Sequence, residues 1–140
     1  MNDILINKMA TIHRCLKRIN EEFDIKNEHV EDEFRLNFTK QDSVVLNLQR
    51  ACEASIDIAN HIIKSSQLGV PQSARDSFQL LAQNQCIQQS TAEALKKMVG
   101  LRNIAVHDYQ ALNLDIVIAV VKHHLKDFEL FCSEVKVLCQ

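Results

Sequence analysis

The chain is organised around one ten-residue stretch, Gly100-Leu101-Arg102-Asn103-Ile104-Ala105-Val106-His107-Asp108-Tyr109. This stretch closes a strongly helical segment and precedes a turn. At about 100° per residue an apolar stripe runs along the helix, and Arg102 falls in its middle. The stripe consists of Leu95, Met98, Val99 and Val106. An arginine in such a stripe must extend its charge to solvent, pair with an acid, or serve a site shared with another helix or subunit.

The chemistry of this stretch depends on whether Arg102 and His107 meet. On an ideal helix their side chains diverge by roughly 140°. They converge only if the helix loosens near Val106 or if two subunits pool their copies. Given convergence, the guanidinium can bind phosphate, and the imidazole can take a proton from a ribose 2′-hydroxyl and return one to the leaving oxygen. That pair suffices for metal-independent RNA cleavage, and Asn103 could add a hydrogen bond. The alternative is that both side chains satisfy the last carbonyls of the helix.

Length and composition favour a single all-α domain covering residues 1–140. A chain of 140 residues can bury a core without a metal or disulfides. Two glycines and one proline leave little material for tight β turns. The formal net charge of −2 provides no global attraction to nucleic acid or to an anionic membrane, so any RNA contact must come from a small basic patch.

The cysteines and the apolar segments indicate the compartment. The five cysteines are odd in number, lie far apart and form no C-x-x-C pair, which argues against a disulfide framework and against zinc. We find neither a signal peptide nor an apolar run of membrane-spanning length. We therefore expect a cytoplasmic protein without metal, cofactor or membrane contact.

Apolar residues at spacings of three and four predict an antiparallel bundle of four main helices plus one short helix. The segments are 2–33, with 28–33 as a frayed end or loop, 41–64, 73–83, the helix that ends in 100–109, and 114–138. Three helix starts are predicted from capping residues: Thr39 with Asp42, a capping box at 90–93, and Asn113. The last helix is predicted to be continuous, with His124 on its core stripe.

A second polar pair lies on the helix predicted at 41–64. Asp57 and His61 are one turn apart and could touch each other. They are either an ordinary surface pair or part of a cleft that also contains Arg102 and His107.

The motif Arg102-Asn103, three residues, His107, then Tyr109 resembles the HEPN superfamily and, within it, the HepT-like toxins. Their pattern is Arg-x4-His-x-Tyr with a polar residue after the arginine, and every position is matched here. The similarity covers nearly the whole chain. It includes 46–50 and 57–61 on the second helix and the turn at 69–71.

This resemblance implies more than the residues themselves show. It implies homodimers in which two Arg/His motifs line one cleft and cleave RNA without a metal. It also implies a partner, an MntA-like minimal nucleotidyltransferase that acts as antitoxin and transfers AMP to the motif tyrosine, here Tyr109. A bulky anionic adduct two residues from His107 would compete with the RNA phosphate for Arg102.

Two other functions remain open at this point. The chain could be a non-catalytic helical subunit that binds a nucleotidyltransferase, since it is acidic and has no broad basic face. It could also be a structural dimeric bundle in which Arg102 pairs with Asp57 or Glu53 across helices.

Overall fold

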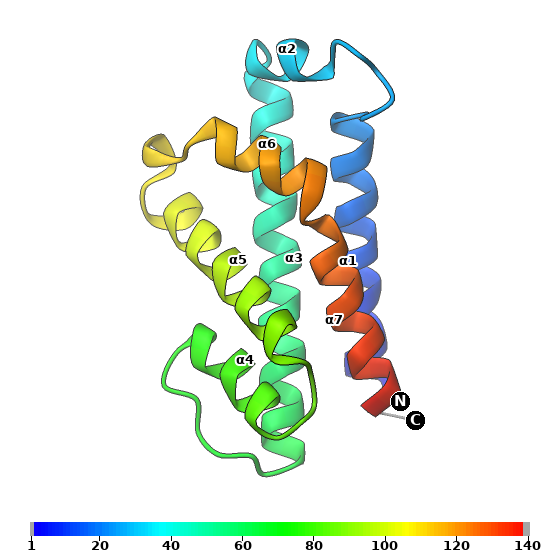
Figure 1. Ribbon diagram of the computed structural model, residues 1–140, viewed down its shortest axis with the longest axis vertical. Helices are drawn as coiled ribbons and strands as arrows, with labels where there is room; N and C mark the ends of the chain where they lie inside the picture. The colour runs from blue at the N-terminus through cyan, green and yellow to red at the C-terminus, as the bar shows by residue number, and fades with distance from the viewer. Residues whose placement is uncertain (1, 139–140) are drawn as a thin grey trace.

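Two long antiparallel helices, α1 (Asp3–Glu22) and α3 (Phe38–Ser65), form one side of the protein in the computed structural model, which describes residues 2–138 (Figure 1). Apolar side chains at helical spacing fill their contact, with Ile12 and Ile19 of α1 and Ile58 and Ala59 of α3 fully buried. Burial of such stripes, rather than intrinsic helix propensity, supplies most of the stability of helices in a protein.

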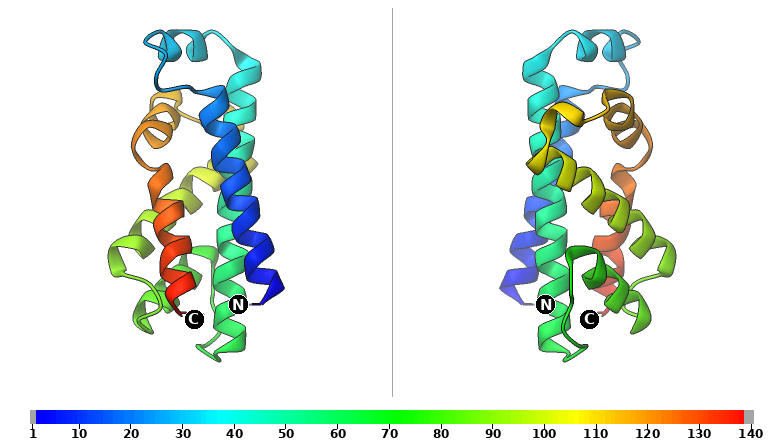
Figure 2. Two further views of the ribbon diagram at one scale, coloured as in Figure 1. Left: turned by 90° about the vertical axis from the view of Figure 1, so that its right-hand side faces the viewer. Right: turned by 90° about the vertical axis from the view of Figure 1, so that its left-hand side faces the viewer.

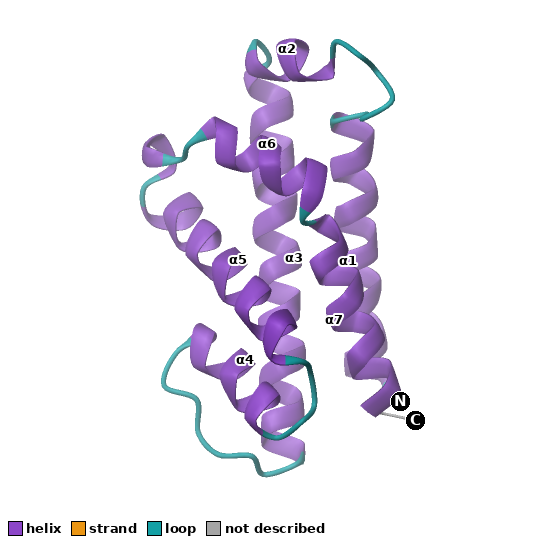
Figure 3. Cartoon of the chain, in the orientation of Figure 1, coloured by secondary structure: helices purple, strands orange, loops and turns teal. Residues whose placement is uncertain are grey.

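Four further α-helices cover the α1–α3 pair from one side (Figure 2). They are α4 (Ala74–Gln83), α5 (Gln89–His107), α6 (Leu114–His123) and α7 (Leu125–Leu138). Phe78 of α4 packs edge-to-face against Phe131 of α7, with ring centroids 5.6 Å apart. The described residues contain helices and loops but no strand, so the predicted all-α bundle is confirmed (Figure 3).

The segment after α1 differs from the prediction. α1 ends at Glu22, and the acidic segment expected to fray contains a short helix, α2 (Val30–Arg35). Three acidic residues in its first turn suit the positive end of the helix dipole. Phe34 of α2 is buried against Phe23, with ring centroids 5.3 Å apart. This aromatic pair holds a six-residue helix that could not be stable alone.

Two of the three predicted helix starts are wrong in detail. The side chain of Asn37, not Thr39, caps α3 by accepting from the amide of Lys40. α5 begins at Gln89, so no capping box at 90–93 opens it. Instead Glu134 of α7 accepts from the amide of Gln88 at 2.9 Å. A cap supplied from another helix has no local sequence pattern. The predicted cap at Asn113 is confirmed.

The predicted long last helix is two helices, because α6 ends at His123 and α7 starts at Leu125. A straight helix would place His124 on the buried stripe, where an unpaired imidazole is costly. With the break, the His124 side chain is 54% exposed and its Nδ1 lies 3.3 Å from Asp127. Ile116, predicted on the same stripe, is also exposed.

Candidate functional site

The C-terminal part of α5 continues into the short 3-10 helix η1 (Tyr109–Ala111). α5 remains α-helical to His107, and the amide of Asp108 still donates to the carbonyl of Ile104 at 2.8 Å. The helix therefore does not loosen near Val106. Arg102 and His107 leave α5 in directions roughly 140° apart. Of the two routes to convergence, only the pooling of two subunits is compatible with this helix.

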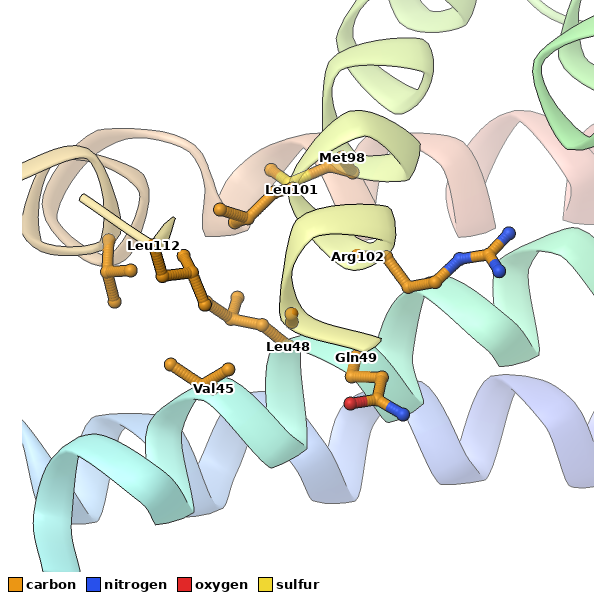
Figure 4. A pocket seen from close by; sticks show the side chains of 9 residues that line it. Val45, Leu48, Gln49, Met98, Leu101, Arg102 and Leu112 are labelled. Carbon is orange, nitrogen blue, oxygen red and sulfur yellow. The ribbon is translucent and has the colours of Figure 1, made fainter. Parts of the chain in front are cut away.

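Arg102 extends its charged group out of the apolar stripe and along α3 (Figure 4). Its Nε lies 3.1 Å from Oε1 of Glu53, and the side chains are 19% and 46% exposed. The Nε–H is not aligned for a hydrogen bond, so the contact is an ion pair at the edge of the core. Such an arginine is held in place by its carbon stem while its guanidinium keeps donors for a second acceptor.

The cavity beside the Arg102 stem is not a ligand site. Its volume is about 10 Å³, at the lower limit for a single water molecule. Its lining is mainly apolar, as Figure 4 shows for Val45, Leu48 and Leu112. This cavity therefore has no room for a phosphate group, and any anion that met Arg102 would have to do so at the outer end of the side chain.

His107 lies exposed in the last turn of α5, and Asn103 is half-buried one turn earlier. Within residues 2–138, neither side chain makes a hydrogen bond or an ion pair. Val106, predicted on the buried stripe, is 47% exposed, and neighbouring Ile104 is 43% exposed. The apolar stripe thus ends before this turn, which presents apolar and polar side chains together at the surface.

Tyr109 is bound to α3. Its hydroxyl donates to Oδ1 of Asp42 at 2.5 Å across 67 residues of sequence. Partial burial, followed by the Asp42 carboxylate, raises the pKa of Tyr109 to about 12. Both effects disfavour the phenolate, so the hydroxyl keeps its proton at neutral pH.

Asp57 and His61 do not touch each other, contrary to the expectation from their spacing. Asp57 pairs with Lys8 of α1 at 2.9 Å, and Nε2 of His61 accepts from the side-chain amide of Asn2 at 2.7 Å. Both side chains are therefore engaged in the contact between α1 and α3. Neither side chain makes a hydrogen bond or an ion pair with Arg102 or His107 within residues 2–138.

Cys52 lies close to Arg102 and could be suspected of reactivity. Burial raises the pKa of its thiol to about 12 and outweighs the opposing charge of Arg102. A thiol that stays protonated is not a nucleophile. Cys15 and Cys132 are likewise buried with raised pKa values, and Cys139 lies outside the described residues. Among residues 2–138 there is no group of three or more His, Cys, Asp or Glu placed to hold a metal ion.

The sequence did not reveal the role of Asp42. The sequence predicts Asp42 only as part of a helix cap with Thr39, whereas in the structure its carboxylate accepts the hydrogen bond of the motif tyrosine. No local pattern could have found it, because its partner is distant in the sequence. The sequence offers two acidic partners for Arg102, Asp57 and Glu53. In the structure Arg102 pairs with Glu53, and Asp57 pairs with Lys8.

The family follows from comparison with known proteins. Residues 12–135 match the family described as ribonuclease HepT-like. The chain belongs to this family. It is 63% identical to the mRNA nuclease HepT of Shewanella oneidensis over 97% of this chain and 98% of that protein. It is 25% identical to the tRNA nuclease HepT of Aphanizomenon flos-aquae over 74% of this chain and 71% of that protein.

Solved structures of HepT-like proteins have the same fold. The tri-AMPylated Shewanella oneidensis HEPN toxin, in complex with MNT antitoxin, matches with a TM-score of 0.90 and 63% identity over 98% of this chain and 99% of that one. A toxin–antitoxin structure with AMP-PNP matches with a TM-score of 0.90 and 62% identity over 97% of this chain and 99% of that one. No helix among residues 2–138 is long and apolar enough to cross a lipid bilayer.

Proposed function

We propose that this HepT-like chain is the toxin of a toxin–antitoxin pair and cleaves mRNA as a homodimer without a metal ion. The observation that carries the proposal is the 63% identity, over nearly both full lengths, to a protein named mRNA nuclease HepT. The relative named a tRNA nuclease is only 25% identical, which favours mRNA over tRNA as the substrate here.

Arg102, His107 and Asn103 are the residues we assign to RNA cleavage. His107 removes the proton of a ribose 2′-hydroxyl, and the 2′-oxygen bonds to the adjacent phosphorus. The bond from this phosphorus to the 5′-oxygen breaks, and the imidazolium returns a proton to the leaving 5′-oxygen. Arg102 binds the phosphate oxygens and stabilises the charge that develops on them. Asn103, one residue along the same turn, supplies a further hydrogen bond to the phosphate. DNA lacks the 2′-hydroxyl and is not a substrate by this route.

The homodimer supplies the convergence that one chain lacks. Arg102 and His107 diverge on an intact α5, so one complete site requires the arginine of one copy and the histidine of the other. The exposed Ile104 and Val106 beside His107 support a contact with a second copy, because such side chains are commonly covered in an interface.

Control of this site is assigned to Tyr109 and a nucleotidyltransferase partner. The matched Shewanella oneidensis toxin is AMPylated and is bound to an MNT antitoxin. Tyr109 is the single tyrosine of this chain and lies exposed two residues after His107. An AMP group there adds negative charge and bulk beside the phosphate site, which would exclude RNA.

Cleavage assays with EDTA present test the proposal. The wild type should cleave mRNA, and His107→Ala and Arg102→Ala should each lose activity by about a hundredfold or more. The melting temperature of Arg102→Ala distinguishes a structural role of this arginine from a role in cleavage. If the role is only structural, the variant should melt at a markedly lower temperature but should still cleave RNA per folded molecule. Full activity of both variants would refute the nuclease assignment and leave a non-catalytic, nucleotidyltransferase-binding subunit.

A second assay tests the modification. The partner with ATP should add multiples of AMP mass to the wild type and none to Tyr109→Phe. Added mass on another residue would contradict the assignment of Tyr109.

A further inference from the structure

The contact between Tyr109 and Asp42 connects the end of the motif to the start of α3. It is the one side-chain hydrogen bond that η1 makes within residues 2–138. The two internal bonds of this segment are short-range, from Ala111 to Asp108 and from Leu112 to Tyr109. The position of η1 against α3 therefore depends on Asp42 and on the packing of Leu112.

The packing around this contact is open. A groove of about 290 Å³ lies between η1, α3 and α6, and Asp42 and Tyr109 line it together with apolar and amide side chains. Phe38 at one end of the groove is 77% exposed, and Tyr109 itself is 44% exposed. With so little buried apolar surface, loss of one hydrogen bond to a carboxylate is a large change for this segment.

The following step rests on the proposed function, in which Tyr109 receives AMP. In that reaction the Tyr109 oxygen bonds to the α-phosphorus of ATP, the bond from this phosphorus to the pyrophosphate breaks, and the hydroxyl proton is lost to water. The product is a phosphodiester with one negative charge and no proton on the former hydroxyl oxygen. It can neither donate to Asp42 nor sit beside the Asp42 carboxylate without repulsion.

We propose that the Asp42–Tyr109 hydrogen bond positions the end of α5 for RNA cleavage and that adenylylation of Tyr109 breaks it. Asp42 is thus a positioning residue that acts on His107 through Tyr109 and touches no substrate. Modification inhibits the site twice, by filling it and by detaching η1 from α3. The negative charge of the phosphodiester thus causes η1 to detach from α3, as a local change of charge does in other modification switches.

Cleavage kinetics of a double-mutant cycle test the positioning role. Asp42→Ala and Tyr109→Phe should each lower kcat by about tenfold with little change in KM, since one charged hydrogen bond is lost and Arg102 still binds phosphate. The double variant should be no slower than either single one, because both remove the same bond. Asp42→Asn should recover most of the activity, because its amide oxygen accepts from Tyr109. Glu31→Ala is the matched control, since it removes a carboxylate that joins α2 to Lys122 of α6 and should leave kcat unchanged.

Hydrogen exchange tests the second half of the proposal. The amides of Ala111 and Leu112 should exchange faster in the adenylylated wild type, and in unmodified Asp42→Ala, than in the unmodified wild type. Equal protection in the modified and unmodified wild type would overturn the detachment. Wild-type kcat in Asp42→Ala, or additive losses in the double variant, would overturn the positioning role. These failures differ from failure of the proposed function, in which His107→Ala itself would remain active or Tyr109 would take no AMP.

Discussion

On α3, Asp57 has a partner on α1 and His61 has one at the N-cap of α1, whereas on α5 His107 projects from the last turn with no hydrogen-bond or ion-pair partner in residues 2–138. The two regions look alike in sequence, because each places a histidine near a charged residue on a helix. In the structure, the α3 pair lies where two long helices meet, and its hydrogen-bonding capacity is used in that contact. His107 lies beyond the end of the apolar stripe of α5 and is exposed.

This difference separates polar residues whose hydrogen-bonding groups are used within the fold from polar residues whose groups stay exposed at the surface. Polar groups at a helix–helix contact find partners because the contact would otherwise lose their hydrogen bonds with water. Polar groups at an exposed helix end keep their hydrogen bonds with water, and here they lie beside the exposed Ile104 and Val106. Arg102 is intermediate, since its Nε lies 3.1 Å from Oε1 of Glu53 while its side chain is still 19% exposed.

Mixed dimers provide the largest test of the comparison. Copies carrying Arg102→Ala and copies carrying His107→Ala should each be inactive alone. If each site pools the two subunits, a mixed dimer of two-fold symmetry keeps one of its two sites and should reach about half of wild-type activity. Cleavage of RNA by co-purified, differently tagged copies measures this.

The matched control is a mixture of two His107→Ala preparations, which should remain inactive. Inactive mixed dimers that are demonstrably dimeric would show that both side chains of a site come from one chain.

The α3 pair should affect stability slightly and cleavage little. Lys8 and Asp57 are 40% and 49% exposed, so Asp57→Ala should cost at most about 1 kcal/mol, as exposed ion pairs do. Denaturant titration should therefore show a small loss, with kcat within about threefold of the wild type. A loss of cleavage comparable to that of His107→Ala, in Asp57→Ala or His61→Ala, would move the α3 pair into the cleft.

Replacing Asp42 should have a smaller effect, a shift in the pH at which Tyr109 loses its proton. The chain has one tyrosine and no tryptophan, so the ultraviolet absorbance of phenolate reports Tyr109 alone. The wild type should titrate near pH 12. Asp42→Ala should titrate between that value and the ordinary 10, because burial, the larger cause, remains. An unchanged midpoint would argue against the Asp42 contact in solution.

The raised pKa of Tyr109 also makes the free energy of unfolding depend on pH. Because the folded-state pKa is raised, the protonated phenol stabilises the fold fully below pH 10, and this stabilisation is lost as the pH rises from 10 to about 12. The stability of the wild type relative to Tyr109→Phe should therefore fall across that range.

Much of the fold was predictable because apolar spacing is a local signal. Helices are present in each of the segments predicted at 2–33, 41–64 and 73–83, and the cap at Asn113 agrees with the structure. The failures occur where a distant residue decides the outcome. Glu134 replaces a local capping box, Phe23 retains a short helix at Phe34, and the break at His124 removes an imidazole from the core.

The sequence by itself determined the helical class, the family motif of Arg102, His107 and Tyr109, and the 140° problem on a regular helix, because each depends on residue order and helix geometry alone. Only the tertiary structure decided that α5 stays regular to His107 and that Asp57 and His61 belong to the contact with α1. It alone brought Asp42 to Tyr109. The physical reason is that side-chain partners are chosen by packing between helices, which joins residues that are far apart in the chain.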